Sequence, residues 1–355
     1  MSMTRILSGL LVVVMVLSMM TMNVFAADSS KVVLSDVPFD YMTNMQTRSF
    51  DSYENLTTPE KKLVYSIPDG VAETLTTEAL LETILNNEFL GDCLAYDNFS
   101  QAVVSKDAYF RFSELIGRDD VNKVLLKYIE KYSNSMSEYE KYKKDILVKV
   151  ENLYDLSDKE IKVVNNALRY NFLNELFNYN NGGLINNLNS RSLSDKTSYV
   201  RTKGGSSVLC YLNPTWSDWN MFESSAELQS IHYYNKYHKK GAEVVSGIDP
   251  SFNCHSYAWH NPNHLVNNIW IPNATAYVVE VRSEGNDITE NEVQVGTIVG
   301  YFNSAGECEH SAIVNELNSD GSIKNVVSKW AHCQLFLHPL TECPYNVSNI
   351  QFFNY

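Results

Sequence analysis

The chain changes its composition sharply near residue 210, and this break constrains the fold more than any other feature. All eight histidines lie between His232 and His338, and all five tryptophans lie between Trp216 and Trp330. The segments before this point follow helical patterns, whereas those after it are rich in strand-forming residues. We therefore expect two regions of different architecture, with the chemically active residues in the second.

The N-terminus has the three-part pattern of a secretory signal peptide. Arg5 supplies the positive charge, ILSGLLVVVMVLSMM is the apolar core, and NVFAA offers small residues for cleavage. The apolar run is short for a membrane span. We predict a secreted chain that begins near Ala27, is extracellular or associated with the cell envelope, and has no membrane span after cleavage.

The rest of the chain divides into four segments by composition. We predict a polar leader over 28–58, a helical domain over 59–180, a linker rich in Asn, Ser and Gly over 181–207, and a second domain over 208–355. The predicted fold class is α+β.

Three segments of the first half have helical periodicity. They are TTEALLETILNNEF, VNKVLLKYIEKY and SDKEIKVVNNALRYNFLNELF, and the last begins with a capping box from Ser157 to Glu160. The apolar positions expected to face the core are Leu80, Leu81, Ile84 and Leu85; Val121, Val124, Leu125 and Tyr128; and Ile161, Val164, Leu168 and Phe172.

The second half mixes one early helix with later strands. SSAELQSIHYYNKYHKK predicts the helix, and TAYVVEVR and VGTIVGYF predict strands from their β-branched and aromatic content. HSAIVNEL and SIKNVVSKW flank the turn residues Asp320 and Gly321, which predicts a β-hairpin.

The formal net charge of −14 argues against a nucleic-acid partner, because binding to phosphates needs a basic surface.

Cys254, in SFNCHSYAWH, has the surroundings of a nucleophilic cysteine. Asn253 can cap a short helix that Pro262 ends, so that Cys254 would lie in its first turn. Backbone N–H groups there stabilise a thiolate. The base expected from elsewhere in the chain is His310, at the start of an apolar strand.

The motifs NCHSYAW, VGTIVGYF and HSAIVNELNSDGSI resemble the CHAP family of papain-like cysteine amidases and peptidases, over about 100 residues between Asp249 and Trp330. The resemblance implies a papain-like domain with Cys254 as nucleophile, His310 as base and no cofactor. It also implies hydrolysis of amide bonds, in peptidoglycan peptides or in a protein substrate.

The third catalytic residue of that family lies on the strand after the hairpin, where this chain has NVVSKW and no carboxylate. Ser328 is the candidate there, because Lys329 carries no acceptor for an imidazolium. The other candidates are Asn325, His332 and His338.

Four residues complete the predicted site. The backbone N–H of Cys254 and the side chain of Asn253 would stabilise an oxyanion. Trp259 and Trp330 would line the substrate groove. The alternative for both tryptophans is that they belong to the hydrophobic core.

Other interpretations of these residues remain open. The absent carboxylate favours a non-catalytic exported binding protein with a degraded papain-like site. A zinc site is the other rival to a nucleophile, although Pro262 interrupts the helix that such a site would need. Its ligands would be Cys254, His255, His260 and His264, with Cys308 and His310 as further donors.

The cysteines allow two alternative pairings for one disulfide. Cys308 and Cys333 lie at nearly equal distances from the hairpin turn, so they are candidate cross-strand partners. Cys333 with Cys343 is the alternative.

Overall fold

The computed structural model describes residues 34–355, with gaps at 49, 51, 97–98, 153, 182–195, 213–218, 264, 266 and 331. Residues Asp36–Tyr355 form one compact unit. The predicted signal peptide lies outside the described residues. Within them, we find no helix that is both long and apolar enough to cross a membrane.

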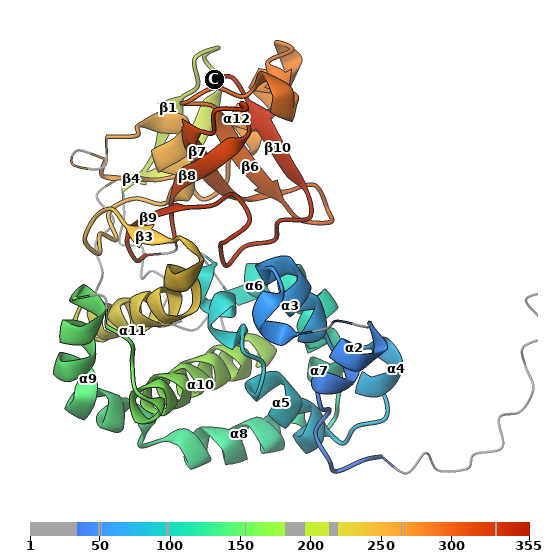
Figure 1. Ribbon diagram of the computed structural model, residues 1–355. Helices are drawn as coiled ribbons and strands as arrows, with labels where there is room; N and C mark the ends of the chain where they lie inside the picture. The colour runs from blue at the N-terminus through green and yellow to red at the C-terminus, as the bar shows by residue number, and fades with distance from the viewer. Residues whose placement is uncertain are drawn as a thin grey trace, which may run out of the picture. The chain divides into compact units, whose positions relative to one another are not determined.

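The described chain is mixed helix and antiparallel sheet, as the α+β prediction states (Figure 1). Helices dominate up to residue 240 and strands dominate after it. The helices are α2 (Met42–Thr47), α3 (Thr58–Val64), α4 (Asp69–Ala72), α5 (Thr77–Leu85), α6 (Phe99–Phe110), α7 (Phe112–Ile116), α8 (Val121–Tyr132), α9 (Ser135–Glu151), α10 (Asp158–Asn180), α11 (Trp219–Tyr237) and α12 (Thr275–Ser283), with short turns η1 (Tyr53–Asn55), η2 (Leu90–Ala95), η3 (His238–Lys240), η4 (Ser256–His260) and η5 (Glu290–Glu292).

The strands form two sheets. The larger has the order β3-β9-β8-β7-β6-β10-β5, and the smaller has the order β1-β2-β4. Their pairings are antiparallel. The strands are β1 (Lys196–Arg201), β2 (Ser207–Leu212), β3 (Glu243–Val244), β4 (Ile269–Trp270), β5 (Asp287–Ile288), β6 (Ile298–Phe302), β7 (Cys308–Leu317), β8 (Ile323–Lys329), β9 (Leu335–His338) and β10 (Ile350–Phe353).

Local sequence signals predict the principal helices correctly. Thr76 caps α5 by accepting a hydrogen bond from the backbone N–H of Ala79. The capping box from Ser157 to Glu160 starts α10. The apolar positions predicted on α5, α8 and α10 are buried, apart from Ile161, which is partly buried. α5 and α10 therefore start at their caps, and all three helices bury the stripe that their periodicity indicates.

The hairpin after His310 is also confirmed. β7 pairs with β8, and Gly321 in the connecting turn has a φ of +88°. This left-handed conformation favours glycine, because a Cβ atom would collide with the neighbouring backbone.

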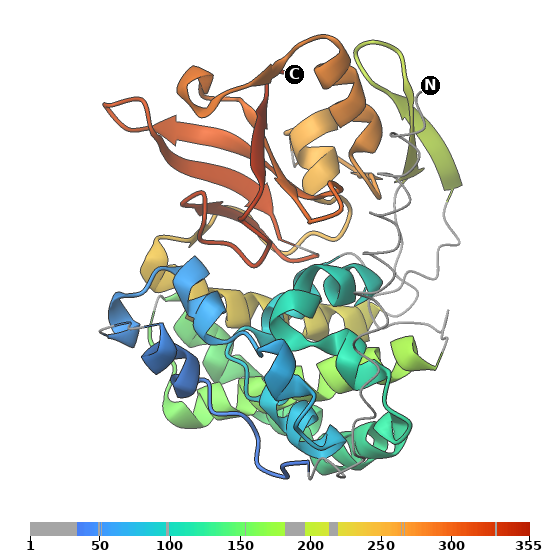
Figure 2. The same cartoon turned by 90° about the vertical axis from the view of Figure 1, so that its right-hand side faces the viewer.

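The segment TAYVVEVR is a helix and not the predicted strand. It forms α12, whose buried residues Tyr277, Val278 and Val281 recur at helical spacing. α12 lies between the large sheet and the β1–β2 ribbon (Figure 2). The β-branched content of the segment suits a strand locally, but a helix buries these three side chains together against two sheets.

The predicted linker and leader both contain packed structure. Within the predicted linker 181–207, residues from Lys196 onward form β1 and pair with β2. Within the predicted leader 28–58, Tyr41 is buried and donates a hydrogen bond of 2.7 Å from its hydroxyl to the carbonyl of Thr83. The described parts of both segments from Asp36 onward belong to the compact unit.

Helix α11 joins the helical half to the sheet, although the sequence assigns it to the second domain. Leu228 and Ile231 pack with α9 and α10, whereas Tyr233 and Tyr237 pack against Trp330 of the sheet region. The packing therefore crosses the predicted boundary at 208.

The large sheet buries two faces. Its inner face packs on the aromatic rings of α11, and its outer face packs under α12 and η4. The inner face carries Val299, Tyr301, Ala312, Val314, Val326, Trp330 and Phe336. The outer face carries Ile298, Phe302, Ile313, Val327, Leu335 and Phe353.

Two buried lysines fasten the helical half to the segment that follows β9. The ammonium of Lys62 donates to the carbonyls of Cys343 and Tyr345, at 2.9 and 3.3 Å. The ammonium of Lys106 donates to the carbonyl of Pro344 at 2.7 Å. Buried charges need such partners, because desolvation of an unpaired ammonium is costly.

Asp92 supplies the countercharge for this cluster. Its fully buried carboxylate lies 3.6 Å from the Lys62 ammonium and accepts a hydrogen bond of 2.7 Å from the Tyr237 hydroxyl. His232 approaches it at 3.4 Å. Although burial opposes its ionisation, the charge of Lys62 and the contact with His232 lower the pKa of Asp92 to about 2.

We predict that Asp92→Asn destabilises the protein by about 3–5 kcal/mol at neutral pH, because it leaves the Lys62 charge buried without its carboxylate. The measurement is urea unfolding followed by circular dichroism. The matched control is Glu78→Gln, which removes an exposed ion pair with Lys127 and should cost less than about 1 kcal/mol. Equal losses for the two variants would contradict this account.

Candidate functional site around Cys254

Cys254 begins a short buried helical turn on the outer face of the sheet. The carboxamide oxygen of Asn253 accepts from the backbone N–H of Ser256 at 3.1 Å, so Asn253 caps the turn as predicted. The same side chain donates to the carbonyl of Ile271 at 2.7 Å and accepts from its N–H at 3.2 Å. The Cys254 side chain is only 6% exposed.

The residues after Cys254 bind to β7 through Ser311. The hydroxyl of Ser311 lies 2.9 Å from Nδ1 of His255 and accepts a hydrogen bond of 2.8 Å from the indole N–H of Trp259. Burial lowers the pKa of His255 to about 4, so that the ring is neutral at pH 7. The Cys254 turn therefore contacts the side of β7 to which Ser311 points.

His310 points to the opposite side of β7. It pairs with Tyr301 on β6, while Ser311 pairs with Gly300, and successive strand residues face opposite ways. The His310 ring stacks on Tyr345 with centroids 3.6 Å apart and rings inclined by 8°. Neither of its ring nitrogens has a hydrogen-bond partner among the described residues.

The sequence-predicted dyad is therefore divided by the sheet. Cys254 belongs to the outer face, and His310 belongs to the inner face, where it is fully buried. Burial, together with His338 and His255, lowers the pKa of His310 well below the usual range. Alternation along β7 turns the His310 imidazole to the inner face, and its role as the base for Cys254 stays a prediction.

The candidates for the third catalytic residue are distributed over the sheet. Ser328 lies within 2.8 Å of Nε2 of His338 and accepts a hydrogen bond of 2.9 Å from the indole of Trp330, all on the inner face. Asn325 lies near the hairpin tip, where it accepts from the carboxamide of Asn315. None of these contacts includes Cys254.

His332 has different surroundings. Its ring stacks on Trp270, with centroids 5.0 Å apart. Trp270 precedes Ile271, whose backbone binds Asn253. Of the residues named for the third position, His332 is thus the one that the structure connects to the Cys254 turn.

The two tryptophans predicted to line a groove belong to the core. Trp330 is fully buried and stacks on Phe336 at 4.1 Å. Trp259 is 2% exposed and stacks on Tyr277 at 5.8 Å. Neither ring is exposed to a substrate. Asn253, predicted as an oxyanion donor, is 1% exposed and instead ties the turn to Ile271.

Sequence reasoning dismissed Lys329, which shares the outer face with Cys254. Its ammonium lies 4.8 Å from the ring centroid of Phe252, two residues before Cys254. Burial lowers the pKa of Lys329 to about 8, against the opposing influence of Cys333, Asp249 and Cys254. The sequence signal that could have identified it is a lysine at the end of the apolar strand segment NVVSKW.

The cysteines form no disulfide among the described residues, and all six are buried. Cys308 lies on the outer face, where its thiol contacts Ser311, whereas the thiol of Cys333 donates to the carbonyl of Ala226 on α11. The predicted pairing of Cys308 with Cys333 is absent because the two side chains are directed to different layers.

The described residues contain no group of three or more His, Cys, Asp or Glu side chains that could hold a metal ion. His264, one of the predicted zinc ligands, lies outside them.

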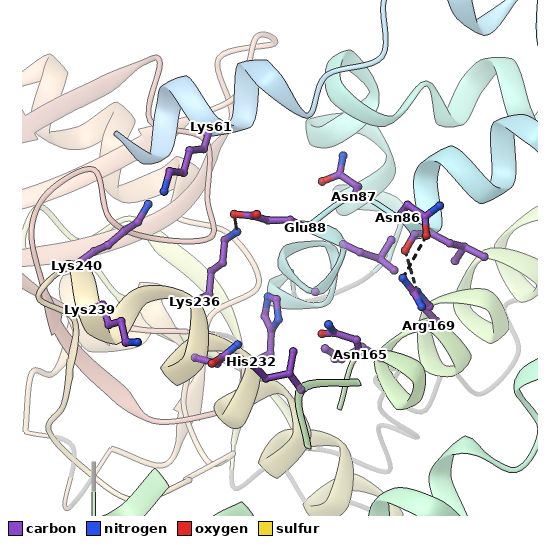
Figure 3. A pocket seen from close by; sticks show the side chains of 16 residues that line it. Lys61, Asn86, Asn87, Glu88, Asn165, Arg169, His232, Lys236, Lys239 and Lys240 are labelled. Atoms are coloured by element: carbon purple, nitrogen blue, oxygen red, sulfur yellow. Dashed lines mark hydrogen bonds and ion pairs between the residues drawn. The ribbon is translucent and has the colours of Figure 1, made fainter. Parts of the chain in front are cut away.

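A polar cavity lies in the helical half, away from Cys254. A cavity of about 490 Å³ is bounded by α3, the end of α5, α10, α11 and η3 (Figure 3). Its polar lining residues are Lys61, Asn86, Asn87, Glu88, Asn165, Arg169, His232, Asn235, Lys236, Lys239 and Lys240. Its size is in the range of small-molecule sites.

Neither a protein-family model, nor a curated protein, nor a solved structure matches this chain.

We predict that the protein loses stability as the pH falls from about 6.5 towards 4. Burial lowers the pKa of both His255 and His338 to about 4, so the folded state binds fewer protons than the unfolded state in this window. Their contribution is complete above pH 6.5, and at pH 4 the loss is on the order of 3 kcal/mol for each. Urea unfolding at a series of pH values measures this slope.

The control for that slope compares two histidine variants. His338→Gln should make the pH dependence shallower, whereas His260→Gln should change it less, because His260 is exposed. The same slope in both variants would show that buried His338 is not a source of the acid sensitivity.

Proposed function

We propose that this chain is an exported binding protein, in which a papain-like core acts as a scaffold and His310 does not serve as a base for Cys254. The resemblance of the NCHSYAW and HSAIV motifs supports the papain-like part of this proposal. The signal-peptide pattern supports export. The resemblance implies cell-wall peptide as the substrate class, and in this proposal the protein binds such a peptide and does not cleave it.

One observation carries the proposal. Cys254 lies on the outer face of the sheet, and His310 lies on the inner face under Tyr345. General base catalysis requires the imidazole within hydrogen-bond reach of the thiol, directly or through one water. To bring His310 there, β7 would have to slip by one residue, which would exchange every side chain between two buried faces.

The cavity in the helical half supports a binding role. It is open and polar, whereas Cys254 and the tryptophans near it are buried. A ligand can thus reach the helical half without any rearrangement of the sheet. We assign recognition to this cavity.

A cysteine hydrolase with another base is the second candidate, and the position of Lys329 favours it. This lysine is buried on the same face as Cys254, and burial lowers its pKa to about 8, so a fraction of it is neutral at neutral pH. A neutral amine can accept a proton from a thiol. In that case Cys254 would attack an amide carbonyl, and the Lys329 ammonium would return the proton to the leaving amine.

We predict that iodoacetamide modifies Cys254 in the folded protein no faster than Cys308, which is similarly buried. Burial shields a thiol from the reagent. Mass spectrometry of tryptic peptides after timed exposure from pH 6 to about 9 measures the two rates. The wild type, His310→Gln and Lys329→Met should give the same result for Cys254.

Two outcomes would overturn the binding proposal. Rapid, pH-dependent modification of Cys254 that His310→Gln abolishes would restore the predicted dyad. Rapid modification that Lys329→Met abolishes but His310→Gln preserves would establish the second candidate. Circular dichroism of each variant confirms that it is folded during the reaction.

A further inference from the structure

The residues that line the cavity of the helical half carry more positive than negative charges. Its lining includes four lysines and Arg169, but the one carboxylate among the lining residues is Glu88. This excess of positive charge occurs in a chain whose formal net charge is −14. A concave basic site on an acidic protein concentrates anions locally.

Neighbouring carboxylates neutralise only part of this charge. Lys236 pairs with Glu88, and Lys240 lies 3.7 Å from Glu342. Lys239 pairs with Asp155 at 2.8 Å, although both side chains are largely exposed. These three lysines therefore have partners before any ligand binds.

Among the described residues, neither Lys61 nor Arg169 has a carboxylate within ion-pair distance. Lys61 is half-buried and forms no ion pair within the described part of the chain, and its ammonium lies 4.5 Å from the ring centroid of Tyr53. Arg169 donates to the carbonyl of Leu85 at 2.9 Å and to two asparagine side chains. These oxygens orient the guanidinium but do not cancel its charge.

The lysines of the cavity also repel one another. Burial lowers the pKa of Lys240, and the charge of Lys61 lowers it further while Glu342 opposes the change. Burial lowers the pKa of Lys236 to about 8, although Glu88 opposes this shift. An anion placed among Lys61, Lys236 and Lys240 would favour the charged form of all three.

The rest of the lining is polar and uncharged. The carboxamides of Asn165 and Asn235 border the cavity, are exposed, and make no hydrogen bonds within the described residues. Figure 3 draws Lys61, Lys236 and Lys240 towards one end of the cavity and Asn165 and Arg169 towards the other. Carboxamides donate and accept, so they suit a ligand rich in hydroxyl groups.

We propose that this cavity binds a small hydroxyl-rich ligand that carries a phosphate or carboxylate group, with the anion at Lys61, Lys236 and Lys240 and the hydroxyl groups at Asn165 and Arg169. This inference rests on the binding function proposed above and names its ligand class. A volume of about 490 Å³ accommodates an acidic monosaccharide with room for a second unit.

The test is isothermal titration calorimetry of the full mature chain with four probes: glucose 6-phosphate, glucuronate, inorganic phosphate and glucose. We expect the two acidic sugars to bind more tightly than either inorganic phosphate or glucose, because only they contact both ends of the cavity. Affinity should fall as ionic strength rises from low to physiological values. Tighter binding of glucose 6-phosphate or of glucuronate identifies the anionic group.

The variant that tests the site is Lys61→Met, which keeps the aliphatic stem and removes a charge without an ion-pair partner. It should raise the Kd of the acidic sugars about tenfold, the loss expected for one charge-assisted hydrogen bond. The matched control is Lys127→Met, on the exposed side of α8, which should leave Kd unchanged. Thermal unfolding of both variants verifies that they are folded.

Three results would overturn the inference: no binding of any acidic sugar, equal affinity for glucose, or equal Kd in Lys61→Met and wild type. None of them depends on the reactivity of Cys254. Failure here with an unreactive Cys254 would reject the ligand class and leave the binding function. Rapid modification of Cys254 would reject the binding function whatever the cavity binds.

Discussion

Two buried ammonium groups hold the structure together where helices meet sheet. Lys62 and Lys106 donate to the backbone carbonyls of Cys343, Pro344 and Tyr345. The buried Asp92 carboxylate compensates their charge. Because all these groups are removed from water, the segment after β9 has a defined position against the helices. That position in turn places the ring of Tyr345 on His310.

The position of Tyr345 has a consequence for function. It covers the inner face of β7, where the His310 ring packs against Tyr301 and Tyr345. On the outer face, Ser311 takes the contacts with the Cys254 turn. One sheet thus separates two groups that the sequence pairs. A basic cavity lies elsewhere, in the helical half, with α10 and α11 among the helices that line it.

Helix caps and turns could be predicted from the sequence because residues a few positions apart determine them. The cap at Thr76, the capping box at Ser157 and the turn at Gly321 all act within a few residues, and the structure contains each of them. The cap at Asn253 belongs to the same class. The segment around Tyr277 was not predictable in this way, because its β-branched residues suit a strand until two sheets enclose them as α12.

The candidate site was predictable only in part, for the same reason. Cys254 at the start of a capped turn follows from the residues around it. Its partner depends on which way β7 faces, and that depends on pairing with β6 and on the cover supplied by Tyr345. The basic cavity gathers Lys61, Arg169 and Lys240 from distant parts of the chain, and no spacing in the sequence links them.

The sequence by itself determined where helices and turns begin, since caps, periodicity and glycine conformation operate over a single turn of backbone. It also determined that the chain is α+β. Only the tertiary structure decided that His310 and Cys254 occupy opposite faces and that α11 belongs to both halves. The physical reason is that side chains alternate along a strand, so the layers packed on each face select what every residue meets.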